Sequence, residues 1–291
     1  MHTGQPLKID DLVALTRPRD KGPQVLAMLE AYFDESGIHD RAAVCVVAGY
    51  FGYANQWRAQ EQKWRKVLKD FNFPLEDFHA TNLIRSKRHQ PMLGKLAEAI
   101  AKSAIYPIAA GIIVDDFNSF SEIQRKWMTG ATILKTGKLK TSGAPTKPYF
   151  IPFQFCLRKV TDYTKPGRKA NFFFGLDKPM AKYAKVMFTQ VKTQKLWSQS
   201  SWQTQRRLGD PAFPLAKETP QLQAADLLVH LTYQHMLERL AINDWNARPS
   251  GMLAICLRNK KSWHDHMFQA KIHLQQMLEQ TYVFAGNWDG H

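Results

Sequence analysis

Runs of apolar residues, separated by polar and turn-forming segments, predict strands in four places. A run over 25–33 predicts the first strand, and a β-branched and aromatic run over 43–51 predicts the second. The connection between them is short, which favours an antiparallel hairpin. Two further apolar runs, over 105–114 and 169–177, predict strands later in the chain. The first two predicted strands are therefore close in sequence, and the other two are separated from them and from each other by longer segments.

Between these runs the apolar positions follow the period of an α-helix. Within 53–71 large apolar residues recur on one helical face, and Asn55 is placed to cap the helix. The pattern over 221–240 is the strongest in the chain, with Thr219 as a candidate N-cap and Pro220 at the first position. Helical patterns also cover 91–104, 117–135, 150–163, 180–195 and 263–281. A hairpin followed by alternating helices and strands indicates an α/β domain with a mixed sheet flanked by helices.

This order divides the chain into three parts. Residues 1–24 are polar and predict a loosely attached N-terminal arm, residues 25–240 form the α/β domain, and residues 241–291 predict a helical C-terminal extension packed on that domain. The start of the chain has no signal-peptide pattern, and no apolar run is long enough to span a membrane. We therefore expect a cytoplasmic protein that does not act at a membrane.

Charge points to a polyanionic partner. The chain has 40 Lys and Arg residues against 25 Asp and Glu, a formal net charge of +15. Nucleic acid is the first candidate partner and an anionic membrane surface is the second, and the alternative is a solvated basic surface without such a role. A basic loop over 134–148 either contacts a nucleic-acid backbone or is a solvated excursion. The candidate nucleic-acid contacts are Lys135, Lys138, Lys140, Arg206 and Arg207.

Carboxylates at the ends of predicted strands are the main candidates for chemistry. Asp34 and Glu35 follow the first strand, Asp177 ends the fourth, and Asp226 lies among apolar residues in the 221–240 helix. Taken alone, Asp34, Glu35 and Asp177 are typical of turns, and Asp226 is typical of the first turns of a helix. Together they favour a site, because functional residues of α/β sheets gather at strand ends. Clustered carboxylates need a cation between them, and oxygen ligands suit Mg²⁺ or Mn²⁺.

Three sequence motifs strengthen this interpretation. The stretches AYFDESG (31–37), DFHATNL (77–83) and LQAADLLVH (222–230) resemble motifs of the DUF3800 family, which is similar to RNase H-like nucleases. The resemblance covers about residues 26–240 and implies an RNase H-like fold. In the family pattern, Asp34 and Glu35 match an acidic pair. Gln223 and Asp226 match a Q-x-x-D helix, and His79 matches the histidine of the middle motif. Asp177 corresponds to an acidic residue of RNase H-like folds by position only.

These residues together predict hydrolysis of phosphodiester bonds by two divalent metal ions. Asp34 would bridge the ions, Asp177 and Asp226 would each complete one site, and Glu35 would be a ligand or orient water. His79 would pass a proton to the leaving group, because histidine side chains commonly act as general acids and bases. Gln223 would orient Asp226 or a phosphate.

Two other functions remain open at this point, a non-catalytic nucleic-acid-binding module and a hydrolase of a small phosphorylated compound. The sequence does not choose between DNA and RNA, or between a monomer, a homodimer and a complex with a partner protein.

Overall fold

The structure is a computed structural model. It describes residues 28–39, 41–130, 132–133, 139–140, 146–176, 206–244, 246–258 and 264–268, together with Ala181, Ala184, Lys185, Phe188, Thr189 and Leu274.

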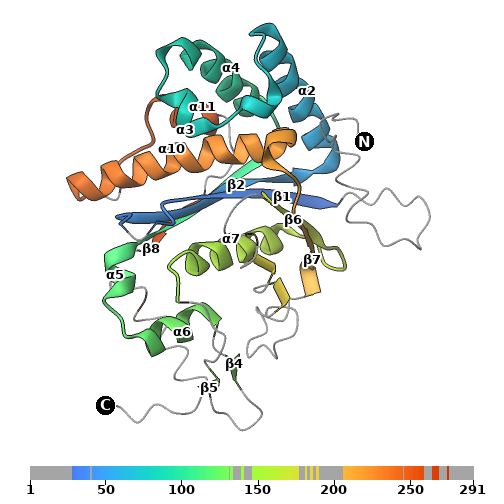
Figure 1. Cartoon of the computed structure of the whole chain (residues 1–291). Helices are drawn as coiled ribbons and strands as arrows, with labels where there is room; N and C mark the ends of the chain where they lie inside the picture. Colours follow the sequence, from blue (N-terminus) through green and yellow to red (C-terminus); the bar gives the residue numbers. More distant parts are fainter. Residues whose placement is uncertain are drawn as a thin grey trace, which may run out of the picture.

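A mixed sheet of six strands, counted over the described residues, forms the centre of the molecule (Figure 1). Its order is β7-β6-β1-β2-β3-β8. The strands are β1 (Leu29–Ser36), β2 (Val44–Tyr53), β3 (Tyr106–Ile113), β6 (Ala170–Phe174), β7 (Leu208–Ala212) and β8 (His264–Phe268). β2 is antiparallel to both neighbours, and the other pairings are parallel. The carboxyl ends of all strands except β2 therefore lie at one edge, which we call the carboxyl edge.

Helices cover both faces of the sheet (Figure 1). One face carries α10, with α2, α3, α4 and α11 packed around it, and the other carries α7, with α5 and α6 nearby. Their bounds are α2 (Ala54–Asp70), α3 (Ala80–Ile84), α4 (Gln90–Ala101), α5 (Val114–Asn118), α6 (Glu122–Gly130), α7 (Phe150–Tyr163), α10 (Pro220–Ile242) and α11 (Gly251–Leu257). Short 3₁₀ turns are η1 (Leu75–Asp77), η2 (Lys87–His89) and η3 (Ala216–Glu218), and a separate hairpin joins β4 (Thr132–Ile133) to β5 (Leu139–Lys140). The predicted α/β architecture, a mixed sheet flanked by helices, is confirmed.

The alternation of β1 side chains divides the core into two layers. Tyr32 faces α10 and stacks on Phe173, with ring centroids 4.4 Å apart. Phe33 faces α7 and lies beside Phe172 and Phe174 of the neighbouring strand. Each fully buried aromatic side chain contributes about 1.5–3 kcal/mol of transfer free energy. These rings fix the register of β1, because a slip by one residue would exchange the two faces.

The acidic motif lies inside β1 rather than after it. The strand was predicted over 25–33, but it continues to Ser36, so Asp34 and Glu35 have strand geometry and point to opposite faces. Gly37 then turns the chain with φ +73°, and an added Cβ would lie 2.0 Å from the Val44 carbonyl oxygen. Glycine is the residue that tolerates this conformation and this close approach.

Two helix boundaries differ from the sequence predictions. The N-cap of α2 is Tyr53 rather than Asn55, because the Tyr53 N–H donates to Oε1 of Gln56 at 2.7 Å. The predicted helix over 117–135 is two helices, α5 and α6. The second begins after Ser121, whose N–H donates to Oε1 of Gln124 at 2.9 Å, so a local cap starts a new helix there.

Four strands were not predicted: β4, which lies in the predicted helix over 117–135, β5, which lies in the predicted basic loop, and β7 and β8 of the central sheet. β7 contains Pro211, which lowers the apparent strand propensity, although an edge strand accommodates proline. β8 lies where a helix over 263–281 was predicted, and it pairs with β3 in parallel. The part of the chain after 240 is therefore not a purely helical extension, because it adds a strand to the central sheet as well as α11. The predicted arm, 1–24, lies outside the described residues, as does most of the predicted helix over 180–195.

None of the helices in the described ranges has the length and apolarity needed to cross a bilayer.

Candidate functional site

A pocket of about 300 Å³ lies where the three motifs meet, and we call it the carboxylate pocket. It is bounded by β1, the segment around η1, the segment around η3, and the first turns of α10. Its lining residues are Asp34, Glu76, Asp77, Phe78, His79, Ala216, Lys217, Leu222, Gln223 and Asp226. The fold thus places residues from distant parts of the sequence around one cavity.

Asp34 lines the carboxylate pocket from β1. Its side chain is 5% exposed and projects from β1 on the same face as Tyr32, toward α10. Oδ1 accepts the backbone N–H of Glu35 at 2.9 Å. A buried carboxylate requires compensating partners, and a pocket that admits water or a cation supplies them.

Glu35 is not brought into the carboxylate pocket. It projects from the other face of β1, where its charge raises the pKa of the buried Cys45 thiol and Tyr149 hydroxyl, in each case after the larger effect of burial. Because successive strand residues alternate between faces, Asp34 and Glu35 cannot both line a site on the α10 side. The acidic pair is therefore divided between two environments.

Asp226 is held in a fixed orientation by the middle motif. Its Oδ2 accepts the backbone N–H of Ala80, the first residue of α3, at 2.8 Å. The first N–H groups of a helix lack intrahelical partners, and negative charge is favoured there. The carboxylate on α10 thus caps α3, and the DFHATNL and LQAADLLVH motifs form one structural unit.

Two histidines flank Asp226. His79 is the N-cap residue of α3, and its exposed side chain lines the pocket. His230 lies one helical turn after Asp226, and its Nδ1 is 3.1 Å from Oγ1 of Thr81. Burial lowers the pKa of His230, Asp226 opposes this effect, and Arg85 and His79 add to it. The burial of His230 therefore favours the neutral form of its ring. Its i+4 spacing from Asp226 was the sequence signal that it belongs beside the site.

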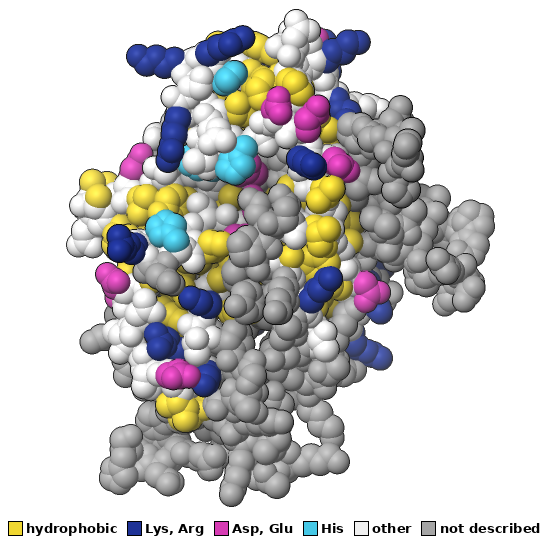
Figure 2. Space-filling model, in the orientation of Figure 1, with side chains coloured by type: hydrophobic (Ala, Val, Ile, Leu, Met, Phe, Trp, Pro, Cys, Tyr) yellow, Lys and Arg dark blue, Asp and Glu magenta, His cyan; other side chains and the backbone are white. Residues whose placement is uncertain are grey.

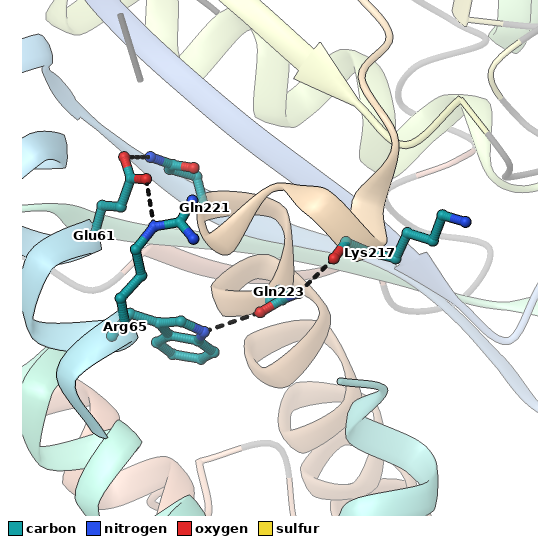
Figure 3. Close-up of polar contacts among 6 residues, drawn as sticks. Glu61, Arg65, Lys217, Gln221 and Gln223 are labelled. Atoms are coloured by element: carbon teal, nitrogen blue, oxygen red, sulfur yellow. Dashed lines mark hydrogen bonds and ion pairs between the residues drawn. The ribbon is translucent and has the colours of Figure 1, made fainter. Parts of the chain in front are cut away.

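Gln223 joins the segments that surround the pocket (Figure 3). Its Nε2 donates to the carbonyl oxygens of Leu75 at 2.8 Å and Lys217 at 3.3 Å, while Oε1 accepts from Nε1 of Trp64 at 3.0 Å. The side chain is 2% exposed. These bonds occupy both amide hydrogens, so Gln223 positions the pocket walls instead of donating to Asp226 or a phosphate.

A second polar contact on the same helix stabilises this region. Glu61 on α2 accepts a hydrogen bond from Nε2 of Gln221 at 3.0 Å and pairs with Arg65 at 2.8 Å (Figure 3). Glu61 and Gln221 are buried, so both groups need these partners. The start of α10 is therefore fixed to α2 at two glutamines, Gln221 and Gln223.

Three further charged residues line the carboxylate pocket and were not predicted as site residues from the sequence. Glu76 and Asp77 are exposed carboxylates at η1, and Lys217 is an exposed cation in η3. Asp77 begins the DFHATNL motif, which was the available signal. Lys217 is the one Lys or Arg among the residues that line the carboxylate pocket, so the pocket has a cation beside its carboxylates.

The described residues do not form a complete two-ion cluster. In the described ranges, no group of three or more His, Cys, Asp or Glu side chains is placed to hold a metal. Asp34 and Asp226 nevertheless line the same cavity, and Mg²⁺ commonly binds through one or two carboxylates with waters and substrate phosphates as its other ligands. Two ions would need further carboxylates. Asp177, the candidate third ligand, lies outside the described residues.

The predicted nucleic-acid contacts are not gathered at this pocket. Lys135 and Lys138 lie outside the described residues, and Lys140 is part of β5. Arg206 and Arg207 precede β7, so they lie at the sheet edge opposite the carboxyl edge. Nη1 of Arg207 donates to the Thr161 carbonyl oxygen at 3.1 Å. Figure 2 shows Lys and Arg side chains spread over the described surface of this face instead of in one block.

No family model and no curated protein matches the chain. A solved structure, described as the crystal structure of Bst-RNase HIII in complex with Mn²⁺, is similar at a TM-score of 0.38 and 13% sequence identity. The match covers 92% of this chain and 74% of that one.

Proposed function

We propose that the chain is a divalent-metal-dependent nuclease that hydrolyses phosphodiester bonds of DNA or RNA. The observation that carries this proposal is that Asp34 on β1 and Asp226 on α10 line the same pocket. The resemblance of the three motifs to the DUF3800 family supports it, because each motif contributes a residue to that pocket. The net charge of +15 adds affinity for a polyanionic substrate.

The two aspartates are suited to hold Mg²⁺ or Mn²⁺. Asp34 is buried on a central strand, and Asp226 is oriented by the Ala80 N–H, so neither carboxylate depends on a flexible loop for its position. Ligating carboxylates are commonly oriented by such outer hydrogen bonds. A bound ion would lower the pKa of a coordinated water and stabilise charge on the leaving oxygen.

The other side chains of the pocket have separate roles. His79 is exposed at the pocket and able to pass a proton to the leaving oxygen. Lys217 offers a cation to a substrate phosphate. Burial lowers the pKa of His230, and the contact of its ring with Thr81 holds it beside Asp226. Gln223 keeps η1 and η3 at the distance that leaves the pocket open.

A second candidate function is a nucleic-acid-binding module without catalysis. It is favoured by one observation, that the described residues contain no group of three or more metal-ligating side chains. This alternative predicts binding that depends on salt but not on Mg²⁺ or Mn²⁺.

A cleavage assay separates the two functions. Labelled single-stranded DNA, duplex DNA, RNA and an RNA–DNA hybrid are incubated with the protein in Mg²⁺, Mn²⁺ or EDTA. We expect metal-dependent cleavage that Asp34→Asn and Asp226→Asn each reduce by at least about a hundredfold, a loss of roughly 3 kcal/mol of transition-state stabilisation. Asp115→Asn, an exposed carboxylate in the first turn of α5, is the matched control and retains activity. Equal cleavage by all variants would refute the proposal.

A further inference from the structure

A second cavity of about 380 Å³ lies near the carboxyl edge of the sheet, and we call it the basic cavity. It is formed by the β1–β2 connection, α5, α6 and the residues that precede α7. Its lining residues are Ile38, His39, Val114, Asn118, Arg125, Thr146, Lys147 and Pro148. None of them lines the carboxylate pocket.

The charges in the basic cavity have one sign. Arg125 and Lys147 are cations, His39 adds a ring that can donate, and no Asp or Glu occurs among the described residues that line it. The nearby carboxylate of Glu122 is paired elsewhere, with Lys126 at 2.6 Å. This pairing is the main reason that the pKa of Glu122 is lowered. The cavity is thus electropositive and open to an anion.

Arg125 is held in place by its own neighbours. Its Nη1 donates to Oδ1 of Asn118 at 3.1 Å, and its guanidinium carbon lies 5.9 Å from the centre of the Phe117 ring. A guanidinium has five N–H donors in a fixed planar arrangement that matches a phosphate. Among the described residues, Asn118 accounts for one of these donors. Fixing the side chain before a ligand arrives lowers the entropic cost of binding.

The basic cavity and the carboxylate pocket are close along the chain. His39 lies five residues after Asp34, so their Cα atoms are at most about 17 Å apart. Val114 directly follows β3, whose carboxyl end lies at the same edge as that of β1. A nucleic-acid strand advances about 3.4 Å per nucleotide along a duplex axis, so a few nucleotides span this separation.

We propose that the basic cavity binds a backbone phosphate of the nucleic-acid strand that lies a few nucleotides from the phosphodiester at the carboxylate pocket. Arg125 and Lys147 neutralise the phosphate, while Asn118 keeps the guanidinium in the cavity wall. The strand crosses the carboxyl edge of the sheet, from the α10 face to the α7 face. This inference rests on the proposed function, since it assigns a polynucleotide as the ligand.

Binding without cleavage tests the cavity separately from catalysis. The affinity for a labelled single-stranded oligonucleotide is measured by fluorescence anisotropy in EDTA over a series of salt concentrations. Arg125→Gln and Lys147→Gln should each weaken binding and lower the salt slope by about 0.7, the value for one lost phosphate contact on a single strand. Lys102→Gln and Lys169→Gln remove the same charge before β3 and β6, at the opposite edge, and should leave the slope unchanged. Melting curves confirm that each variant is folded.

The outcomes separate this inference from the proposed function. If Arg125→Gln binds with the wild-type affinity and salt slope, the assignment of the cavity is wrong, whatever the activity of the aspartate variants. If Arg125→Gln weakens binding while Asp34→Asn still cleaves, the cavity is supported and the catalytic proposal fails. A second arm uses inorganic phosphate alone. A phosphate-induced rise in Tm that Arg125→Gln abolishes, with oligonucleotide binding unchanged, would assign the cavity to a small phosphorylated ligand and overturn the proposal.

Discussion

The backbone N–H of Ala80 donates to Oδ2 of Asp226 at 2.8 Å, so a carboxylate of α10 caps the short helix α3. This hydrogen bond has two structural effects. It stabilises the segment that carries His79, and it holds the other carboxylate oxygen in a defined direction at the pocket. The two effects can be separated by substitution, because an amide accepts the same hydrogen bond but is a poorer metal ligand.

Asp226→Asn should leave the free energy of unfolding close to that of the wild type, whereas Asp226→Ala should lower it by about 1 kcal/mol through loss of the cap. Urea denaturation followed by circular dichroism measures both. Both variants should lose metal-dependent cleavage. Equal stability of the alanine and asparagine variants would show that the Ala80 bond contributes nothing.

Asp34 and Glu35 should differ sharply in their importance for catalysis. Since Glu35 projects from the face opposite the carboxylate pocket, Glu35→Gln should retain cleavage within about tenfold, while Asp34→Asn loses at least about a hundredfold, differences of roughly 1.4 and 3 kcal/mol. Initial rates at saturating metal provide the comparison, and matched melting temperatures exclude unfolding. A larger loss in Glu35→Gln than in Asp34→Asn would contradict the strand geometry described above.

We expect Gln223 to contribute to the free energy of unfolding of the protein. Gln223→Leu leaves the buried indole N–H of Trp64 and the Leu75 carbonyl oxygen without their partner. Each buried group left unsatisfied costs about 1–3 kcal/mol, so we expect a loss of at least about 2 kcal/mol in urea denaturation. Gln62→Leu, at an exposed position of α2, is the control and should change stability little. If the two variants are equally stable, the described hydrogen bonds do not hold the pocket together.

The three cysteines should be unreactive in the folded protein. Cys45, Cys156 and Cys256 are buried, and burial raises the pKa of Cys45 and Cys156. An aromatic disulfide reagent at pH 8 should label almost no thiol before unfolding and three after it. Both thiols stay protonated when folded, so their contribution to stability should fall as the pH rises above about 8.5, the unfolded value. Rapid labelling of a thiol in the native protein would show that the described core is open to solvent.

The sequence predicted the parts of the fold that repeat a simple pattern. The β1–β2 hairpin, α4, α7 and α10 lie where runs or helical spacing of apolar residues predicted them, because one or both faces of each are buried in the core. β7 and β8 were missed because their stability comes from pairing with β6 and β3, and such long-range pairing leaves little local signal.

For the site, the three motifs identified the residues that meet at the pocket, but not the role of each. The strand was expected to end before Asp34, so the sequence did not show that Asp34 and Glu35 alternate between faces. Gln223 was expected to act on Asp226 or a phosphate, whereas it bonds to Trp64, Leu75 and Lys217. The length of β1 and the partners of Gln223 both depend on tertiary contacts. The local sequence pattern does not reveal such contacts.

Metal binding in the absence of substrate tests the central claim most directly. Titration of Mn²⁺ into the metal-free protein, followed by isothermal titration calorimetry, compares the wild type with Asp34→Asn, Asp226→Asn and the control Asp115→Asn. We expect the wild type and Asp115→Asn to bind Mn²⁺ with similar affinity. Asp34→Asn and Asp226→Asn should each lose at least about tenfold in affinity, roughly 1.4 kcal/mol. Mn²⁺ binding that is unchanged in both Asp34→Asn and Asp226→Asn would contradict a shared metal site between β1 and α10.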